Sequence, residues 1–333
     1  MTRCSPTFAF RCVLALSFSA ALAASEWSQT QAPPPLAKDQ IRVVTNEVVV
    51  AATVTDPSGE FVLDLSQKDF HVFDDGVEQK IDHWDLGGDP LAVVLVLETS
   101  SRPHAMIPVV HSLGSIFTET AMALDGEAAV ITYDSTVEVR QPFTLDHDAV
   151  EAAIASVQFE DPRRNLYDAM ARAVGMLRDE APMRRRIMLI VGESRDDGSK
   201  AKLGEIVRDA EHANISIYAV GPSSMTRDLL QDAPALWAAP AIFLLQQGKN
   251  KAKNHELEVA AAATGGIHYS VVRAATLRDA LDKIGGELHA QYIIGYQPNS
   301  ERAPGFHSIR VTVSRPNVFI RTRPGYYLAS PAN

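Results

Sequence analysis

The most constraining feature of this sequence is an unbroken apolar run, Leu91–Leu97, which ends at an acid followed by hydroxyl side chains. A run without polar alternation is typical of a strand buried on both faces, at the centre of a parallel sheet. Ligands of such sheets bind just beyond the carboxyl ends of the strands. Glu98 and the Thr-Ser-Ser segment 99–101 occupy that position, and their oxygen atoms suit Mg²⁺ or Ca²⁺. The next residue, Arg102, argues against a cation there, because its side chain is always positively charged.

The first 23 residues have the pattern of a signal peptide. Two arginines come first, Cys12–Ala23 is apolar, and its last three residues form an Ala-x-Ala cleavage site. This run is too short to span a bilayer comfortably, and no other stretch is long and apolar enough to do so. We therefore expect a periplasmic or secreted protein that starts near Ala24 and has no integral membrane segment after cleavage. A membrane anchor at residues 1–23 is the alternative.

The charge and cysteine content of the expected mature chain exclude several classes of function. Both cysteines, Cys4 and Cys12, lie in the leader, so disulfides, thiolate metal sites and a cysteine nucleophile are excluded together. Loss of the two leader arginines leaves 29 basic residues against 41 acidic ones, a net charge of about −12. Such an acidic chain does not favour nucleic acid or anionic lipid as a partner.

The chain changes character several times after the leader. Residues 24–40 are polar with a Pro triplet, which indicates an exposed linker. Strand patterns and turn signals fill 41–89 and return at 292–328, before a short tail at 329–333. Between them, residues 90–291 alternate strands with amphipathic helices, which predicts a doubly wound, mostly parallel α/β sheet. The simplest arrangement inserts this α/β domain into a small, split β-sandwich-like domain. The strands expected in the α/β domain are 91–97, 128–133, 136–140, 186–191, 215–220 and 267–271.

Eight short motifs are distributed over residues 41–328, and their order and spacing carry a family resemblance. They are LDLSQKDFHVFDDGVEQKI (63–81), VVLVLETSS (93–101), AAVITYDSTVEVRQPFT (128–144), NLYDAM (165–170), IMLIVGESRDDGS (187–199), SIYAVG (216–221), AAATGGIHY (261–269) and AQYIIGYQP (290–298). Together they resemble the von Willebrand factor A family, and more narrowly its exported bacterial relatives of the acidobacterial type. The resemblance implies a Rossmann-like α/β domain that binds a protein partner.

The functional feature of that family is a metal-ion-dependent adhesion site. One strand end supplies Asp-x-Ser-x-Ser, a second loop supplies Thr and a third strand end supplies Asp. These residues hold Mg²⁺ or Mn²⁺ with one open position, which an acidic residue of the partner fills. In this sequence the first Asp position is Glu98, the first Ser position is Ser100 and the second Ser position is Arg102.

The other two positions of the family site also differ. The Thr position falls at Arg164, or at Asn165 if the loop shifts by one residue. The last Asp position falls at Glu193, with Asp196 and Asp197 nearby. Only one of the five positions keeps the family residue, so the site is degenerate. The longer acids disturb a geometry that Mg²⁺ requires to be nearly octahedral, and arginine offers no lone pair to a metal.

Three interpretations of this site remain open. In the first, the site has decayed and the domain is a scaffold. In the second, the arginines occupy the place of the cation and pair with Glu98 and Glu193, which keeps a metal-independent binding surface. In the third, Glu98, Ser100 and Glu193 still bind Mg²⁺ or Mn²⁺ while the arginine side chains point away. We favour the second, an exported adhesion or binding module without a cofactor.

An enzymatic function, a hydrolase above all, is the competing hypothesis. The sequence has no H-E-x-x-H pair, G-x-S-x-G elbow or Walker A loop. Ser100 and His104 form the nearest Ser/His pair, and they read as a hydroxyl at a helix start and a surface histidine. Asp74-Asp75-Gly76 reads as a hairpin turn and not as a calcium site. Residues 222–254 exceed a typical connection, and they predict either a buried helix or an exposed partner-binding element.

Overall fold

The computed structural model describes most of the chain from residue 47 onward. The described residues are 47–87, 90–101, 110, 113–122, 126–159, 161–179, 184–221, 255–271, 274–298 and 302–328. The expected leader, the linker, Arg102, His104, the 222–254 connection and the tail lie outside these ranges. Among the described helices none is long and apolar enough to cross a membrane.

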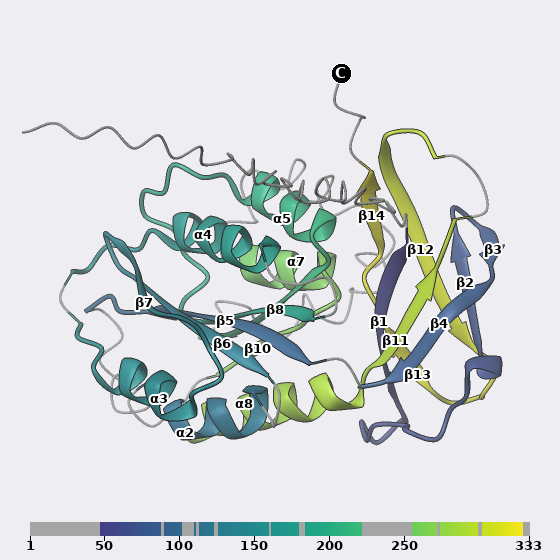
Figure 1. Ribbon diagram of the computed structural model, residues 1–333, viewed down its shortest axis with the longest axis horizontal. Coiled ribbons are helices and arrows are strands. Elements are labelled where there is room, and N and C mark those ends of the chain that lie inside the picture. The colour runs from purple at the N-terminus through teal and green to yellow at the C-terminus, as the bar shows by residue number, and fades with distance from the viewer. Residues whose placement is uncertain are drawn as a thin grey trace, which may run out of the picture. The chain divides into compact units, whose positions relative to one another are not determined.

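A six-stranded, mostly parallel sheet forms the centre of the α/β region (Figure 1). Its strand order is β10-β9-β8-β5-β6-β7, and only β7 runs antiparallel, at the edge. The bounds are β5 Leu91–Glu98, β6 Glu127–Tyr133, β7 Val137–Thr144, β8 Arg185–Val191, β9 Ile215–Gly221 and β10 His268–Ser270. The strands expected from the sequence are confirmed, with ends shifted by a few residues. The apolar run is β5, which pairs in parallel with β6 and β8 and is buried throughout.

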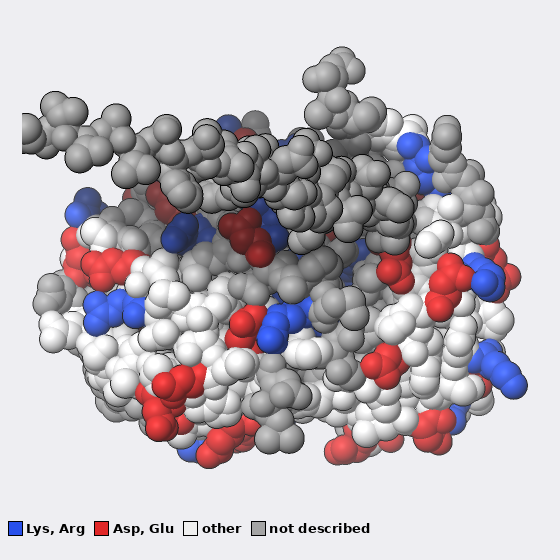
Figure 2. Space-filling model, viewed as in Figure 1, with Lys and Arg blue, Asp and Glu red and all other residues white. Residues whose placement is uncertain are grey.

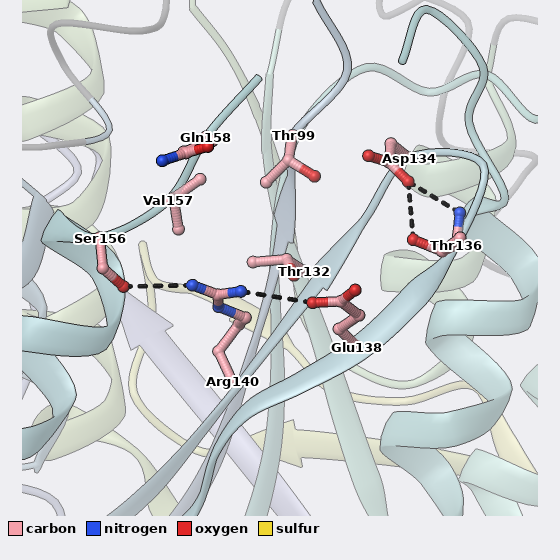
Figure 3. Close-up of a pocket in the computed structure, with 9 residues that line it drawn as sticks. All are labelled: Thr99, Thr132, Asp134, Thr136, Glu138, Arg140, Ser156, Val157 and Gln158. Atoms are coloured by element: carbon pink, nitrogen blue, oxygen red, sulfur yellow. Dashed lines mark hydrogen bonds and ion pairs between the residues drawn. The ribbon is translucent and has the colours of Figure 1, made fainter. Parts of the chain in front are cut away.

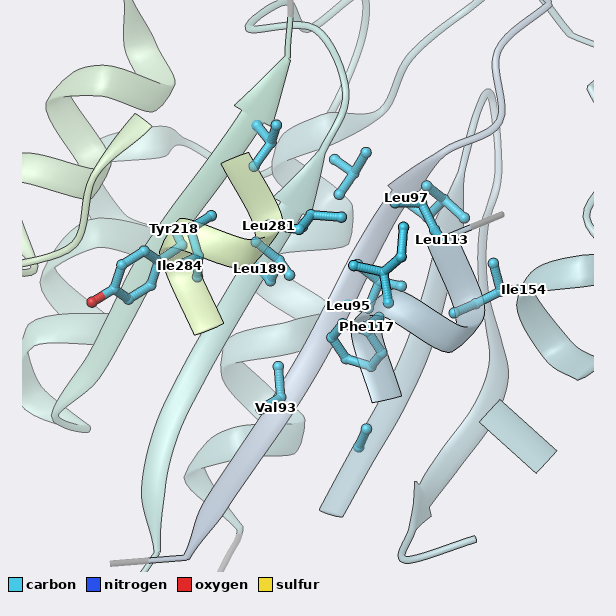
Figure 4. Close-up of a cluster of buried hydrophobic side chains, with 14 of the residues drawn as sticks. Val93, Leu95, Leu97, Leu113, Phe117, Ile154, Leu189, Tyr218, Leu281 and Ile284 are labelled. Atoms are coloured by element: carbon cyan, nitrogen blue, oxygen red, sulfur yellow. The ribbon is translucent and has the colours of Figure 1, made fainter. Parts of the chain in front are cut away.

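Helices cover both faces of this sheet. Alternate residues of β5 point to opposite faces, so Val93 and Leu95 join one hydrophobic cluster while Val94 and Val96 join another. Figure 4 shows the first cluster, in which apolar side chains of the helices meet those of the strands. The helices of the first face are α2 Leu113–Phe117, continued by η2 Thr118–Met122, α3 His147–Ala155 and α8 Ala274–Ala290. Those of the second face are α4 Leu166–Arg178, α5 Leu203–His212 and α7 Glu256–Ala263.

Strands from before and after the α/β region pair with one another. They form two four-stranded antiparallel sheets, β13-β1-β11-β4 and β14-β12-β2-β3, which share one hydrophobic cluster. In the first sheet Val50 pairs with Ile294, and in the second Val72 pairs with Val311. The bounds are β1 Val48–Thr55, β2 Phe70–Asp74, β3 Val77–Gln79, β4 Ile81–Leu86, β11 Tyr292–Tyr296, β12 Gly305–Val313, β13 Phe319–Arg321 and β14 Gly325–Leu328, with a short 3-10 turn η1 at Gln67–Asp69.

The predicted hairpin turn at Asp74-Asp75-Gly76 is confirmed between β2 and β3. Asp75 has φ 49° and Gly76 has φ 81°, so both central residues are left-handed, as a tight two-residue hairpin requires. Glycine adopts this conformation without strain, and aspartate tolerates it.

Residues 45–333 form one compact unit, within which polar contacts join the α/β region to the flanking strands. Gln291, between α8 and β11, donates to the hydroxyls of Thr53 and Tyr218 at 3.1 and 3.0 Å. Arg321 of β13 pairs with the buried Glu287 of α8. The surface is of mixed charge: Figure 2 shows acidic side chains spread over the face in view, with basic ones between them.

Candidate functional site

The candidate site lies at the carboxyl edge of the central sheet, where several loops meet. Glu98 is the last residue of β5, and Glu193 follows the neighbouring strand β8 by two residues. Arg164 comes from the loop that leads into α4. Parallel strands end at the same edge, so the topology itself brings these side chains together. Arg164 and Glu98 are 2% and 3% exposed, which makes their charges costly unless they compensate one another.

The guanidinium group of Arg164 lies among three carboxylates. Its Nε atom is 2.8 Å from Glu98 Oε1, one terminal nitrogen is 3.0 Å from Glu193 Oε2, and the other is 3.5 Å from Asp197 Oδ2. The backbone N–H of Asp197 also donates to the carbonyl of Arg164 at 2.8 Å, which ties the two loops together. Each nitrogen of the planar fork therefore faces a different acid, as charge-assisted bonding favours.

The carboxylate of Glu98 has further hydrogen-bond donors besides Arg164. The backbone N–H of Glu193 donates to Oε2 at 2.6 Å, and the hydroxyl of Ser100 donates to Oε1. Burial raises the pKa of Glu98, and these donors together with Arg164 offset part of that effect. Burial alone lowers the pKa of Arg164, but Glu98 and Glu193 more than compensate, so its pKa is raised. Ser100 is thus a buried hydroxyl that donates to Glu98.

The residue between β8 and Glu193 must be small. A Cβ atom at Gly192 would lie 2.7 Å from the Cβ of Glu98 and would overlap the hydroxyl of Tyr133. That hydroxyl is fully buried and has no hydrogen-bond partner among the described residues. Burial raises the pKa of Tyr133 well above its usual range. The glycine therefore permits the loop after β8 to approach β5 closely enough for Glu193 to reach Arg164.

The other residues expected at the site have supporting roles in the loops. Asn165 donates to the carbonyl of Ser135 at 2.7 Å and does not replace Arg164 among the carboxylates. Asp196 accepts from the backbone N–H of Tyr167 at 3.2 Å and from the hydroxyl of Ser199 at 2.6 Å, so it holds the start of α4. Its neighbour in the sequence, Asp197, is the third acid on Arg164, and the sequence offered no sign of which of the two would take that place.

A polar pocket of about 310 Å³ begins next to Glu98, at Thr99 (Figure 3). Arg140 crosses this pocket between two neighbours, with one terminal nitrogen 3.3 Å from Glu138 and the other 3.3 Å from the hydroxyl of Ser156. Threonine hydroxyls and Asp134 complete much of the lining. Hydroxyl and charged groups of this kind suit polar side chains of a protein partner better than an apolar ligand.

The donor set at Arg164 does not fit a divalent cation. Glu98 Oε1 and Glu193 Oε2, the oxygens that a metal would use, are bonded to the guanidinium group. A cation in the same place would lie against a permanent positive charge without a lone pair. The arrangement can instead hold the loops rigidly and present the outer edges of Glu193 and Asp197, whose side chains are 31% and 24% exposed.

The fold and site together define a doubly wound α/β domain with a charged cluster at the carboxyl ends of its strands. Three solved structures resemble parts of the chain. A von Willebrand factor type A protein from Catenulispora acidiphila is 10% identical over 78% of this chain and 73% of its own, with a TM-score of 0.48. An aerotolerance-related membrane protein from Bacteroides fragilis, with multiple mutations to serine, is 12% identical over 59% and 98%, with a TM-score of 0.42. BatB, a conserved hypothetical protein from Bacteroides thetaiotaomicron, is 14% identical over 60% and 98%, with a TM-score of 0.39. No protein-family model and no curated protein sequence matches the chain.

Proposed function

We propose that the chain is an exported, non-enzymatic protein-interaction module of von Willebrand factor A type, whose strand-end site works without a bound metal ion. The observation that carries the proposal is the guanidinium group of Arg164, which lies among three carboxylates and compensates their charge. An arginine held in this way keeps the site loops in one arrangement, a task that a cation performs in the family that the motifs resemble. The doubly wound sheet and the order of the motifs support the family.

The charge of the site indicates the chemistry of the partner. Arg164 is buried and cannot itself reach a partner, whereas Glu193 and Asp197 are partly exposed. Glu98, Glu193 and Asp197 outweigh the two charges of Arg164 and of Arg195, which lies 3.5 Å from Asp197, so the outer edge of the cluster is acidic. We therefore expect the partner to contribute a lysine or arginine, the opposite of the acidic residue that a metal-bearing site binds.

Metal independence is tested by calorimetry and thermal unfolding of the mature protein. We expect no heat of binding with Mg²⁺ or Mn²⁺ at millimolar concentration and no response of the melting temperature to EDTA, because a ligand of the native state must stabilise it. A metal-induced rise in the melting temperature would reject this proposal in favour of an adhesion site built on Glu98, Ser100 and Glu193.

Reversal of the site toward the family pattern provides the positive control. The variant with Glu98→Asp, Arg102→Ser, Arg164→Thr and Glu193→Asp restores acids and hydroxyls of the lengths that Mg²⁺ accepts. We expect this variant, and not the wild type, to bind Mg²⁺ or Mn²⁺ measurably by calorimetry.

The partner is sought by pull-down from the envelope fraction of the producing cell, with and without EDTA. We expect capture to be unaffected by EDTA and to be lost in the variant with Glu193→Lys and Asp197→Lys, which reverses the charge of the outer edge. Glu205→Lys, an exposed position on α5, is the matched control for the gain of positive charge. Capture that requires a divalent ion, or that survives the reversal of charge, contradicts the proposed mode of binding.

Two further parts of the proposal concern export and the flanking strands. We infer that the leader is removed near Ala24, so N-terminal sequencing of exported protein should not begin at Met1. We also infer that residues 41–89 and 292–328 are halves of one β-sandwich-like domain, which the cross-pairing of β1 with β11 and of β2 with β12 supports. Deletion of 292–328 should then cause aggregation, because it exposes unpaired strands; a monomeric, cooperatively folded truncation would argue against the shared domain.

A further inference from the structure

A second pocket lies at the opposite edge of the central sheet, beside the amino ends of β8 and β9, and has a volume of about 280 Å³. It is bounded by these strands, by α5 and by residues of β1, β11 and the connection between β13 and β14. Its charged lining residues are Arg184, Arg185, Arg186, Arg323, Glu47 and Glu211. Four guanidinium groups against two carboxyl groups give this pocket a composition unlike that of the Arg164 site.

Two of these side chains are buried without complete hydrogen bonding. Glu211 of α5 is 3% exposed, and neither of its carboxyl oxygens has a hydrogen-bond partner among the described residues. Arg323 is 6% exposed; it donates to the side chain of Asn214 at 2.9 Å, while its Nε atom has no partner in the described part of the chain. Buried polar groups are costly unless they are bonded, so an acid and an arginine in this state mark an incomplete site.

The remaining arginines of the lining have hydrogen-bond or ion-pair partners that hold them in place. Arg185 donates to the carbonyl of Leu288 at 2.6 Å, and Arg186 donates to the carbonyl of Ala213 at 2.8 Å. Arg184 pairs with Glu127 of β6 at 3.0 Å.

Glu211 differs from an ordinary surface acid in its protonation at neutral pH. Burial raises the pKa of Glu211 to about 8, although Arg323 and Arg208 act to lower it. The carboxyl group is then mostly protonated near pH 7 and can donate a hydrogen bond. An anion in the pocket would meet the guanidinium group of Arg323 together with a neutral donor from Glu211.

The rest of the lining limits the size and character of a ligand. Apolar side chains of Val49, Ile187, Ile215 and Ile293 line the pocket next to the charged groups. A volume of about 280 Å³ lies just below the roughly 300 Å³ at which the usual range of small-molecule sites begins. The pocket therefore suits a small molecule with one anionic group and a short apolar body.

We propose that this pocket binds the oxyanion group of a small molecule, a carboxylate or a phosphate, which accepts hydrogen bonds from Arg323 and from the carboxyl group of Glu211. The ligand satisfies both buried groups and contacts the apolar wall with the rest of its surface. Because the lining comes from the central sheet and from the flanking strands, occupancy stabilises their junction. This site is separate from the Arg164 cluster and does not depend on the function proposed for that cluster.

The test measures binding of defined oxyanions to the full mature protein at pH 7 and constant ionic strength. Butyrate and succinate represent the carboxylate class, inorganic phosphate represents the phosphate class, and chloride is the control for salt. We expect one class to bind saturably by calorimetry at millimolar concentration or below and to raise the melting temperature with concentration. The class that binds identifies the ligand chemistry, and the absence of saturable binding by either class overturns the proposal.

Two substitutions of Glu211 separate a binding role from a structural one. Glu211→Gln keeps a hydrogen-bond donor and should bind within a few-fold of wild type, whereas Glu211→Leu removes the donor and should weaken binding at least about tenfold. Leucine is apolar and about as large, so the Leu variant is expected to fold. Arg315→Gln, at an exposed pair with Asp64, is the control for loss of one positive charge and should bind as wild type does. Equal binding by the wild-type and Leu proteins overturns the role of Glu211.

Discussion

Near each end of strand β8 lie a buried arginine and a buried glutamate, and the two sets differ in how completely their polar atoms are bonded. At the carboxyl end, the three guanidinium nitrogens of Arg164 each face an acid, and the acid Glu98 has two further donors. At the amino end, Arg323 and Glu211 are buried to a similar degree, yet the carboxyl group of Glu211 is unbonded among the described residues. Burial of charge thus does not reveal its role. A cluster whose polar atoms are all bonded to one another stabilises the loops around it. A cluster with unbonded polar atoms can still form hydrogen bonds with a ligand.

The largest effect is expected at the completed cluster. Arg164→Met removes the positive charge and leaves Glu98 buried without its cationic partner, so the free energy of unfolding should fall by about 3–5 kcal/mol. Urea unfolding at pH 7 measures the change. Arg163→Met is the matched control, because that side chain is 67% exposed and pairs with Asp161 at the surface, so its loss should leave stability nearly unchanged. Similar losses in both variants would mean that the cluster is not a self-compensating unit.

The close approach of the loop after β8 to strand β5 is tested by adding a single methyl group at Gly192. Gly192→Ala should destabilise the protein by about 1–3 kcal/mol, because the new Cβ would overlap Glu98 and Tyr133. Gly175→Ala, within α4, provides the contrast: no atom lies within 4 Å of the added Cβ, and alanine favours the helix, so stability should rise by up to about 1 kcal/mol. Thermal and urea unfolding of the two variants should therefore shift in opposite directions, and a shared direction would contradict the packing described for the loop after β8.

The unbonded carboxyl group of Glu211 should make the free energy of unfolding depend on pH. The pKa of Glu211 is raised from 4.5 to about 8 in the folded state. The contribution of its protonated carboxyl group to the free energy of unfolding is therefore fully present below about pH 4.5 and is lost as the pH rises toward 8. Arg323, Arg208 and Tyr327 are the charged or titratable groups coupled to it. Glu211→Gln should remove this loss, so its stability relative to wild type should increase by about 1–2 kcal/mol between pH 5 and 6.5.

The control for this pH effect is Glu205→Gln on the same helix. Its side chain is 54% exposed, so the difference in stability from wild type should not change over the same pH range. Urea midpoints at several pH values check both variants. A parallel pH dependence in wild type and Glu211→Gln would show that Glu211 is ionised in the folded protein and that the two ends of β8 are more alike than proposed.

The smallest effect is expected at the rim of the Arg164 cluster. Arg195 is 60% exposed and lies 3.5 Å from Asp197, which already faces Arg164. Arg195→Ala should change the free energy of unfolding by no more than about 0.5 kcal/mol, because exposed ion pairs contribute little. If Arg195→Ala lowered the free energy of unfolding as much as Arg164→Met, Arg195 would have to be counted as part of the stabilising cluster.

The sequence predicted the central sheet well because its signals are local. The apolar run that became β5 and the Asp-Gly turn between β2 and β3 each depend on neighbouring residues only. The meeting of Glu98, Ser100, Arg164 and Glu193 could be expected from the family resemblance, since parallel strands end at one edge. The sequence could not predict that Asp197, and not Asp196, faces Arg164, because this depends on the path of the loop and on the length of the side chain.

The Glu211 pocket escaped prediction for a different reason. Glu211 and Arg323 are far apart in the sequence, and no motif connects them. One signal was available: Leu203, Val207 and Ala210 form the apolar face of α5, and Glu211 follows Val207 by four residues on that same face. An acid within an apolar stripe is the kind of local conflict that often marks a functional position.

The pairing of β1 with β11 also determines when the protein can finish folding. Val50 is among the first residues of the described chain, but its partner Ile294 emerges from the ribosome only after the whole α/β region. Closing so long a loop is slow, since contacts between residues distant in sequence carry a large entropic cost before they form. The edges of the N-terminal strands therefore remain unpaired until synthesis is nearly complete.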